Sequence, residues 1–325
     1  MTAQASPGKV DSGFQSGNAA AHTNGIALVK PAKTLASALP DLLVEAHRIA
    51  ATVASGWHGR RQAGPGETFW QFRPFTPGES VTRIDWRKSA RDDALHVRER
   101  EWESAHTLWL WPDLTPSMNF RSDGVSVTKE TRALVLMLAM ADLLPRSGER
   151  VGIPGLMPPT HDRRAAERAA RALALAPSPD PLPDPGMIRR FQDVIVFGDF
   201  LDDAETILAR LSAIAMTGAR GHLVQVLDPV EETFPFSGRT EFRDPETGAT
   251  IKAGRAETWR AAYQARLAAH RASLVERTSR LGWTFLVHHT DRSAADVLLA
   301  LHARLAGSGA AAHAMALTGR AGAAR

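Results

Sequence analysis

The chain has 325 residues, of which 44% are hydrophobic and 23% charged, a composition typical of a folded globular protein. It contains no cysteine, which excludes disulfides, zinc–thiolate sites and a thiol nucleophile and is typical of a reducing compartment. The net charge is +4, but the arginine-rich stretch between Gly59 and Glu103 carries nine basic and eight acidic residues. A nucleic-acid site needs a field of one sign, so binding to nucleic acid is not expected.

The two ends of the chain differ in composition from its middle. Residues 1–36 mix small and polar side chains without periodicity, which predicts a flexible leader and no signal peptide. Residues 306–325 are rich in alanine and glycine and are predicted to be a disordered tail. No apolar run approaches the about 18 residues needed to cross a bilayer. We therefore expect a cytoplasmic protein without a membrane span.

A helix and an irregular segment follow the leader. Apolar residues recur at three- and four-residue spacings from Leu39 to Val53, which predicts an amphipathic helix that ends at Gly56. The next segment is dense in arginine and aromatic residues, and its prolines and glycines exclude one long helix. We expect residues 37–106, the helix and this segment together, to pack on the core of the domain that follows.

Predicted strands alternate with predicted helices between residues 107 and 305. Short apolar runs predict the strands, and longer apolar or amphipathic runs predict the helices. The strands are Thr107–Trp111, Glu149–Ile153, Asp193–Phe197, His222–Leu227 and Trp283–Val287, the helices are 128–144, 162–175, 203–216, 255–280 and 291–305, and turns or a hairpin occupy 231–254. Strands joined through helices run parallel. We therefore predict an α/β fold, a doubly wound, mostly parallel sheet with helices on both faces.

Oxygen-bearing side chains follow the first predicted strand. Asp113, Thr115 and Ser117 stand at alternate positions in a loop that contains proline. One such residue is enough to cap the next helix, whereas a carboxylate with two hydroxyls offers the oxygen ligands that suit Mg²⁺ or Mn²⁺. Asp199 follows another predicted strand, and ligands of parallel sheets bind beyond the carboxyl ends of the strands. We predict a divalent-cation site there; the alternative is a polar turn that only caps the helix.

These residues also carry a resemblance to known proteins. The loop from Asp113 to Ser117 is similar to the Asp-x-Ser-x-Ser loop of von Willebrand factor A-type domains, which forms a metal-ion-dependent adhesion site. More specifically, about residues 45–305 resemble the bacterial domain-of-unknown-function family 58, in which such motifs precede a von Willebrand A-like fold. The motifs are Phe72–Glu79, Arg83–Arg87, Ser89–Arg91, Val97–Glu99, Gly198–Leu201 and Asp228–Phe236. Members of that family commonly accompany MoxR-type AAA+ ATPases.

The resemblance implies a set of ligands. Asp113, Thr115 and Ser117 would hold the ion together with Asp199, and Thr160 is the nearest candidate for the threonine that a second loop supplies. Thr115 replaces the first serine of the pattern and keeps its hydroxyl. The ion would keep an open position for an acidic side chain of a partner or client protein. We expect Asp113→Ala and Asp199→Ala to weaken partner binding while leaving folding largely intact.

The upstream motif has two interpretations. Arg83, Asp85, Trp86 and Arg87 can form an ion pair beside a buried tryptophan that clamps an irregular segment onto the sheet. Alternatively, they form a docking surface for the ATPase.

The predicted function is a non-enzymatic interaction module, an accessory partner of a MoxR-type AAA+ ATPase in protein maturation or metal insertion. The sequence lacks the spacings of a Ser-His-Asp triad, a nucleophile elbow, a P-loop and a His-Glu-x-x-His site. The alternative is a Mg²⁺-dependent phosphotransferase or phosphatase of the haloacid dehalogenase type, which Asp113, Lys129 and the acidic loop after Gly198 loosely resemble. Those enzymes use a second aspartate as general acid where this chain has Thr115, and a hydroxyl is a poor proton donor.

Overall fold

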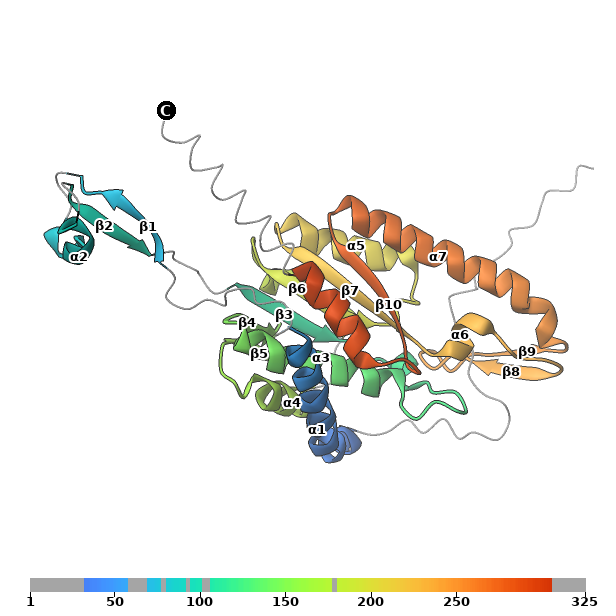
Figure 1. Ribbon diagram of the computed structural model, residues 1–325. Helices are drawn as coiled ribbons and strands as arrows, with labels where there is room; N and C mark the ends of the chain where they lie inside the picture. The colour runs from blue at the N-terminus through green and yellow to red at the C-terminus, as the bar shows by residue number, and fades with distance from the viewer. Residues whose placement is uncertain are drawn as a thin grey trace, which may run out of the picture.

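The computed structural model describes residues 32–57, 69–76, 80–91, 94–100, 106–176 and 180–305. Most of the predicted leader and the whole predicted tail lie outside this part of the chain. The centre is a six-stranded sheet with the strand order β10-β7-β6-β3-β4-β5 (Figure 1). Its strands are β3 (Thr107–Pro112), β4 (Arg150–Ile153), β5 (Met157–Thr160), β6 (Asp193–Gly198), β7 (Arg220–Leu227) and β10 (Thr284–His289).

The sheet is mostly parallel, as predicted. All neighbouring strands pair in the parallel direction except β4 and β5. The antiparallel edge strand β5 was not predicted, because two of its four residues are prolines, which cannot donate to a ladder. The strand order reverses between β3 and β6, since the chain leaves β3 towards β4 and returns on the other side to form β6. In sheets of this kind, ligands bind beyond the carboxyl ends of the strands at such a reversal.

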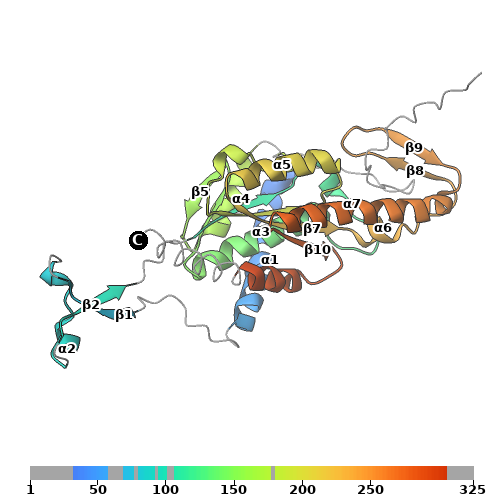
Figure 2. The same cartoon turned by 90° about the horizontal axis from the view of Figure 1, so that it is seen from above.

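Helices cover both faces of the sheet (Figure 2). Helices α1 (Ala32–Trp57), α3 (Lys129–Arg146) and α4 (Ala165–Leu175) pack on one another, with helix 294–305 beside α1. Helices α5 (Ala204–Met216) and α7 (Arg260–Arg280) pack together on the opposite face. The crossover from β3 to β4 and the crossovers from β6 to β7 and from β7 to β10 run in opposite directions along the sheet, and right-handed crossovers then place their helices on opposite faces. Helix α3 is buried along almost its whole length because it is apolar on nearly every side. No helix in the described part of the chain combines the length and apolarity that a bilayer span requires.

Short helical segments complete the connections. Helix α6 follows β7, and single turns occur before α2, after β3, before β6 and before α7. Their bounds are α2 (Trp86–Ser89), α6 (Pro229–Thr233), η1 (Val81–Arg83), η2 (Pro116–Asn119), η3 (Pro185–Met187) and η4 (Ala256–Trp259).

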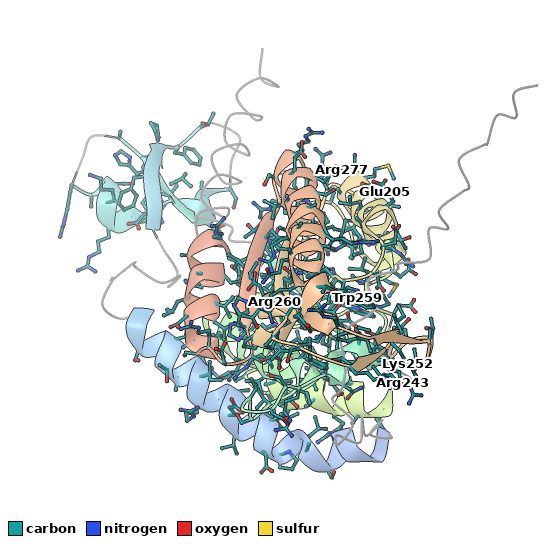
Figure 3. All side chains as sticks on the ribbon, turned by 90° about the vertical axis from the view of Figure 1, so that its right-hand side faces the viewer. Glu205, Arg243, Lys252, Trp259, Arg260 and Arg277 are labelled. Atoms are coloured by element: carbon teal, nitrogen blue, oxygen red, sulfur yellow. The ribbon has the colours of Figure 1, made fainter. Side chains whose placement is uncertain are left out.

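A hairpin with its own small core lies beside the start of α7. Strands β8 (Thr240–Arg243) and β9 (Thr250–Ala253) pair in the antiparallel direction, in the stretch where the sequence predicted turns or a hairpin. Aromatic rings fix its base: Phe242 stacks on Phe234 with ring centroids 5.5 Å apart, and on Trp259 at 6.0 Å. Figure 3 labels Arg243 and Lys252 on the hairpin, and Trp259 and Arg260 where η4 is followed by α7.

The arginine-rich segment forms a second hairpin. Strands β1 (Phe69–Pro74) and β2 (His96–Arg100) pair in the antiparallel direction, with η1 and α2 between them. Figures 1 and 2 show this hairpin apart from the six-stranded sheet, whereas α1 contacts α3 and α4. Residues 58–68 and 101–105, which join the hairpin to the rest, lie outside the described part of the chain. The packing of this segment on the domain stays a prediction.

A buried ionic group holds the amino edge of the sheet together. Asp193, the first residue of β6, accepts hydrogen bonds from Arg220 Nε at 2.8 Å and from Arg220 Nη2 at 3.2 Å. His106 Nε2 and His222 Nε2 lie 3.1 and 3.7 Å from its Oδ2. Burial alone would raise the pKa of Asp193, but the two neighbouring histidines lower this pKa far below its ordinary value.

We expect Asp193→Asn to lower the free energy of unfolding at pH 7 by about 2 kcal/mol, because the bond to Arg220 loses its charge. A carboxylate with a lowered pKa stabilises the folded state above its unfolded pKa of 3.8 and loses this contribution as the pH falls through its folded pKa. The difference between wild type and variant should therefore shrink below about pH 4. Urea denaturation across this range measures it, with Asp291→Asn, at an exposed position, as control. An undiminished difference at pH 3 would contradict the prediction.

Candidate functional site

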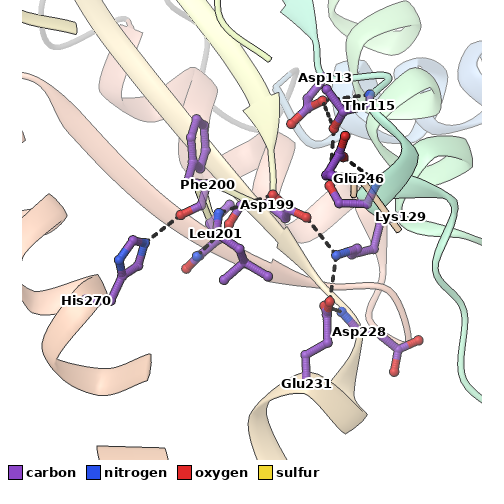
Figure 4. Close-up of polar contacts among 12 residues, drawn as sticks. Asp113, Thr115, Lys129, Asp199, Phe200, Leu201, Asp228, Glu231, Glu246 and His270 are labelled. Carbon is purple, nitrogen blue, oxygen red and sulfur yellow. Dashed lines mark hydrogen bonds and ion pairs between the residues drawn. The ribbon is translucent and has the colours of Figure 1, made fainter. Parts of the chain in front are cut away.

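Three neighbouring strands end in an aspartate at the same edge of the sheet. Asp113 follows β3, Asp199 follows the last residue of β6, and Asp228 follows β7. Asp113 donates its backbone N–H to the carbonyl oxygen of Phe197 at 2.8 Å, so the first two strand ends are level. Asp113 and Asp199 are each 3% exposed, and they flank the reversal of strand order. The structure thus brings these two predicted ligands together (Figure 4).

The loop after β3 folds its hydroxyl groups back on the carboxylate. Asp113 Oδ1 accepts hydrogen bonds from the Thr115 backbone N–H at 2.9 Å and from the Thr115 hydroxyl at 2.7 Å. The Ser117 hydroxyl lies 3.2 Å from that of Thr115. Gly198 leaves room for this arrangement, because a Cβ atom at that position would lie 3.1 Å from Asp113 Oδ2.

The loop after β6 holds the second carboxylate. Asp199 Oδ1 accepts a hydrogen bond from the Leu201 backbone N–H at 3.2 Å, and the Ser117 hydroxyl also bonds the Asp199 side chain. Between them, Phe200 has a φ of +50°, a left-handed conformation that is strained for a residue with a bulky side chain. Its carbonyl oxygen lies 2.7 Å from His270 Nε2, which helps to hold the strained turn. Such strain is frequent where a functional group must be aimed.

A buried lysine joins the site to the fold. Lys129, the first residue of α3, is fully buried and donates to Asp199 Oδ2 at 2.9 Å and to Glu231 Oε1 at 2.6 Å. The other oxygen of Glu231 accepts the backbone N–H of Asp228 at 2.9 Å. Asp228 Oδ2 in turn accepts the backbone N–H of Ser122 at 2.9 Å. Loops that follow β3, β6 and β7 are therefore tied together through one ammonium group.

Lys129 makes the pKa values of the two aspartates differ. Burial would raise the pKa of Asp199, but the charge of Lys129 and its hydrogen bond lower it. Within the described ranges no cation pairs with Asp113, and burial together with the charge of Asp199 raises its pKa to about 8, against two hydrogen bonds from Thr115. Near neutral pH the site therefore holds a proton on Asp113, in a position where a metal cation can replace it.

The donors present fit a hard divalent cation. The set consists of two buried carboxylates and two hydroxyls, all of which are oxygen donors of the kind that Mg²⁺ and Mn²⁺ prefer. The unpaired charge that Asp113 would carry after losing its proton supplies the attraction. Within the described residues, no three His, Asp or Glu side chains are grouped as a metal site, so hydroxyl oxygens would have to complete the coordination here.

Thr160 does not belong to this site, which corrects the prediction that it supplies the second-loop threonine. It pairs with Val151 on β4, and Val151 pairs with Leu108 on β3. Leu108 lies five residues before Asp113, about 17 Å along a strand. The threonine thus sits near the opposite edge, where its hydroxyl accepts the backbone N–H of Asp162 at 3.1 Å.

The upstream motif forms a small exposed surface. Trp86 is 63% exposed, and because the residues that join this hairpin to the sheet lie outside the described part of the chain, the clamp interpretation stays a prediction. Asp85 caps α2 by accepting the backbone N–H of Lys88 at 2.9 Å, and Arg87 is exposed. Arg83 belongs to η1, and its side chain lies outside the described part of the structure.

Lys129 and Glu231 are the residues that sequence reasoning missed as members of the site. From the sequence, Lys129 fits only the phosphotransferase alternative. One feature of the sequence could have identified Lys129: it begins a helix that is apolar on nearly all sides. Such a helix is buried, and a charge buried with it must be paired with acidic side chains. Glu231 lies three residues after Asp228, the N-cap of α6, which is the spacing of a capping box, and the structure contains that capping box.

Comparisons with known proteins place the chain among uncharacterised relatives. A family model described as "Protein of unknown function DUF58" matches residues 71–273, more than half of the chain. The chain is 26% identical over 279 residues to the uncharacterized protein Mb1516 of Mycobacterium bovis and to the uncharacterized protein Rv1480 of Mycobacterium tuberculosis, covering 79% of this chain and 86% of each relative. It is also similar to the crystal structure of the conserved hypothetical protein BatB from Bacteroides thetaiotaomicron, at 15% identity and a TM-score of 0.38, covering 62% of this chain and 100% of that one.

Proposed function

Because the chain belongs to the DUF58 family, whose function is unknown, we propose a function from its own residues: a non-enzymatic module that binds a protein partner through a divalent cation. The observation that carries the proposal is the buried pair Asp113 and Asp199 at the reversal of strand order. Asp199 forms an ion pair with Lys129, whereas no basic side chain forms an ion pair with Asp113 among the described residues. A cation at Asp113 would replace the proton held there and pair with the carboxylate.

Asp113, Thr115, Ser117 and Asp199 would hold the ion, which is Mg²⁺ or Mn²⁺ in our proposal. Bound there, the cation supplies an open coordination position for a carboxylate of a partner or client protein. The loops around it are fixed by Lys129 and by the backbone hydrogen bonds described above. They therefore lose little conformational freedom when the partner binds. Preorganisation of this kind favours affinity.

The partner that we propose is a MoxR-type AAA+ ATPase, on the family resemblance of the sequence motifs, with a role in protein maturation or metal insertion in the cytoplasm. Trp86 and Arg87 on the N-terminal hairpin offer a second contact surface, since exposed tryptophan and arginine are enriched where protein partners bind.

Binding of Mn²⁺ to the full chain, followed by electron paramagnetic resonance, tests the cation site. We expect one site in the wild type, affinity at least about tenfold weaker in Asp113→Ala, since one lost charged ligand costs about 1.4 kcal/mol or more, and no change in Asp123→Ala, an exposed control in a later turn. The earlier expectation that Asp199→Ala leaves folding intact is revised, because this change would leave Lys129 buried with one carboxylate fewer. Wild-type affinity in Asp113→Ala would refute the site.

Association with a purified MoxR-type ATPase, measured by biolayer interferometry, tests the partner. We expect binding in Mg²⁺ and its loss in EDTA and in Asp113→Ala; binding that survives EDTA would count against a cation bridge. Phosphatase turnover with Mg²⁺ that disappears in Asp113→Asn would instead support the phosphotransferase alternative.

A further inference from the structure

The tip of the β8–β9 hairpin reaches the candidate site. Glu246 Oε1 accepts a hydrogen bond from the backbone N–H of Ser117 at 2.9 Å. These residues are 129 positions apart in the chain, so the contact is made by tertiary folding. Figure 4 shows the Glu246 side chain beside Asp113 and Thr115. A carboxylate from elsewhere in the chain therefore lies against the loop that is proposed to hold the cation.

The hairpin presents this carboxylate on a rigid turn. Asp244 organises the tip: its carboxylate accepts the Glu246 backbone N–H at 2.9 Å and the Thr247 hydroxyl at 2.6 Å. Its backbone N–H donates to the carbonyl oxygen of Ala249 at 2.8 Å, and its carbonyl oxygen accepts the Gly248 N–H at 2.9 Å. At the other end, the aromatic core around Phe242 fixes the base. The position of Glu246 is thus built into the hairpin.

The surroundings of Glu246 are acidic. Partial burial and the charges of Asp199, Glu246 and Asp244 raise the pKa of Asp202, in that order. Carboxylates placed near one another repel. The Ser117 N–H attracts the Glu246 carboxylate, and a divalent cation beside Asp113 would attract it further. Glu246 is also exposed, so the contact is weak enough for a competing carboxylate to displace it.

We propose that Glu246 occupies, within the chain, the position that the carboxylate of a partner takes, so that the β8–β9 hairpin is a displaceable cap on the site. This inference rests on the proposed function and adds its regulation. A partner must offer an acidic side chain that outcompetes Glu246 for the Ser117 N–H and the cation. The intramolecular carboxylate competes at an effective concentration of about millimolar or more, so isolated acidic residues bind poorly while the cap is closed.

Solution NMR of the full chain tests the cap. The probe is N-acetyl-glutamate methylamide, whose one carboxylate is in the side chain, and the readout is the amide resonance of Ser117 with and without Mg²⁺. In Mg²⁺, we expect Glu246→Ala to bind the probe at least about tenfold more tightly than the wild type. In the wild type Glu246 occupies the site in most molecules and so lowers the apparent affinity for the probe, and the variant lacks this competitor. Glu241→Ala is the matched control, since Glu241 lies on the same hairpin and pairs with exposed Lys252 at 3.3 Å.

The outcomes separate the cap from the cation site. Equal probe affinity in the wild type and Glu246→Ala, or the same gain in Glu241→Ala, would overturn the cap. A gain confined to Glu246→Ala that does not depend on Mg²⁺ would support the cap and refute the cation. Hydrogen exchange at the Ser117 amide gives a second measure without the probe: it should be faster in Glu246→Ala than in the wild type and in Glu241→Ala, and unchanged exchange would count against the cap.

Discussion

Replacing Lys129 with methionine is expected to lower the free energy of unfolding by about 3–5 kcal/mol, because two carboxylates stay buried after losing their shared cation. The ammonium group bonds Asp199 at 2.9 Å and Glu231 at 2.6 Å and has no access to solvent. Methionine keeps most of the length and volume of the side chain. The loss of stability is therefore caused mainly by the missing charge and only slightly by a cavity. Equilibrium denaturation in urea at pH 7 measures it.

A compensated variant makes this prediction specific. In Lys129→Met/Asp199→Asn/Glu231→Gln the buried charges disappear together, and we expect more than half of the lost stability to return, since uncompensated charge causes most of the cost. If the triple variant is as unstable as Lys129→Met alone, the cost lies in packing instead. A loss below about 1 kcal/mol in Lys129→Met would be typical of an exposed ion pair and would contradict the buried triad.

Asp113→Asn is expected to remove a pH dependence of stability in protein free of divalent cations. The pKa of Asp113 rises from 3.8 in an ordinary environment to about 8 in the folded protein. The folded state therefore holds a proton that the unfolded state has lost between these two values. Stability from this proton is fully present below the unfolded pKa and is lost as the pH rises towards the folded pKa, by up to about 1.4 kcal/mol per pH unit.

Asparagine resembles the protonated carboxyl group and does not titrate. We expect the variant and the wild type to be similarly stable near pH 4, and the variant to be more stable at pH 8 by up to about 4 kcal/mol. Thermal denaturation in EDTA at several pH values measures the difference. Mg²⁺ should restore the wild type alone, because a cation replaces the lost proton. Parallel curves for the two proteins would show that Asp113 has no raised pKa.

The sequence was sufficient for the architecture because the signals were local. The apolar runs that became β3, β6 and β7 are too short for helices and each ends in an aspartate, so alternation with helices dictated the parallel sheet. The same reasoning placed Asp113 and Asp199 at one edge. It failed for β5, where two prolines in four residues hide an edge strand, and in the arginine-rich segment, where proline and glycine mask the hairpin of β1 and β2.

The finer chemistry of the site depends on tertiary contacts that no local pattern encodes. Lys129 meets Glu231 across 102 positions, and Ser117 meets Glu246 across 129. A charge pattern can show that a buried lysine needs partners, but many acids lie at comparable distances along the chain. Thr160 illustrates the opposite error: a residue of the right chemistry stands after the right strand, yet the antiparallel turn of β5 carries it to the far edge.

The Asp199 carboxylate bonds a fully buried lysine as well as its own loop, whereas the Asp113 carboxylate accepts hydrogen bonds from Thr115 in the loop after β3. One oxygen of Asp199 accepts a hydrogen bond from Lys129, and the other accepts one from the Leu201 amide. A substitution of Asp199 in evolution therefore also requires substitutions around Lys129. Asparagine at position 113 leaves Lys129 and its partners in place, and we expect it to make the protein more stable at alkaline pH. If the site holds a cation as proposed, its loss in evolution should therefore begin at Asp113, in relatives that keep Lys129, Asp199 and Glu231.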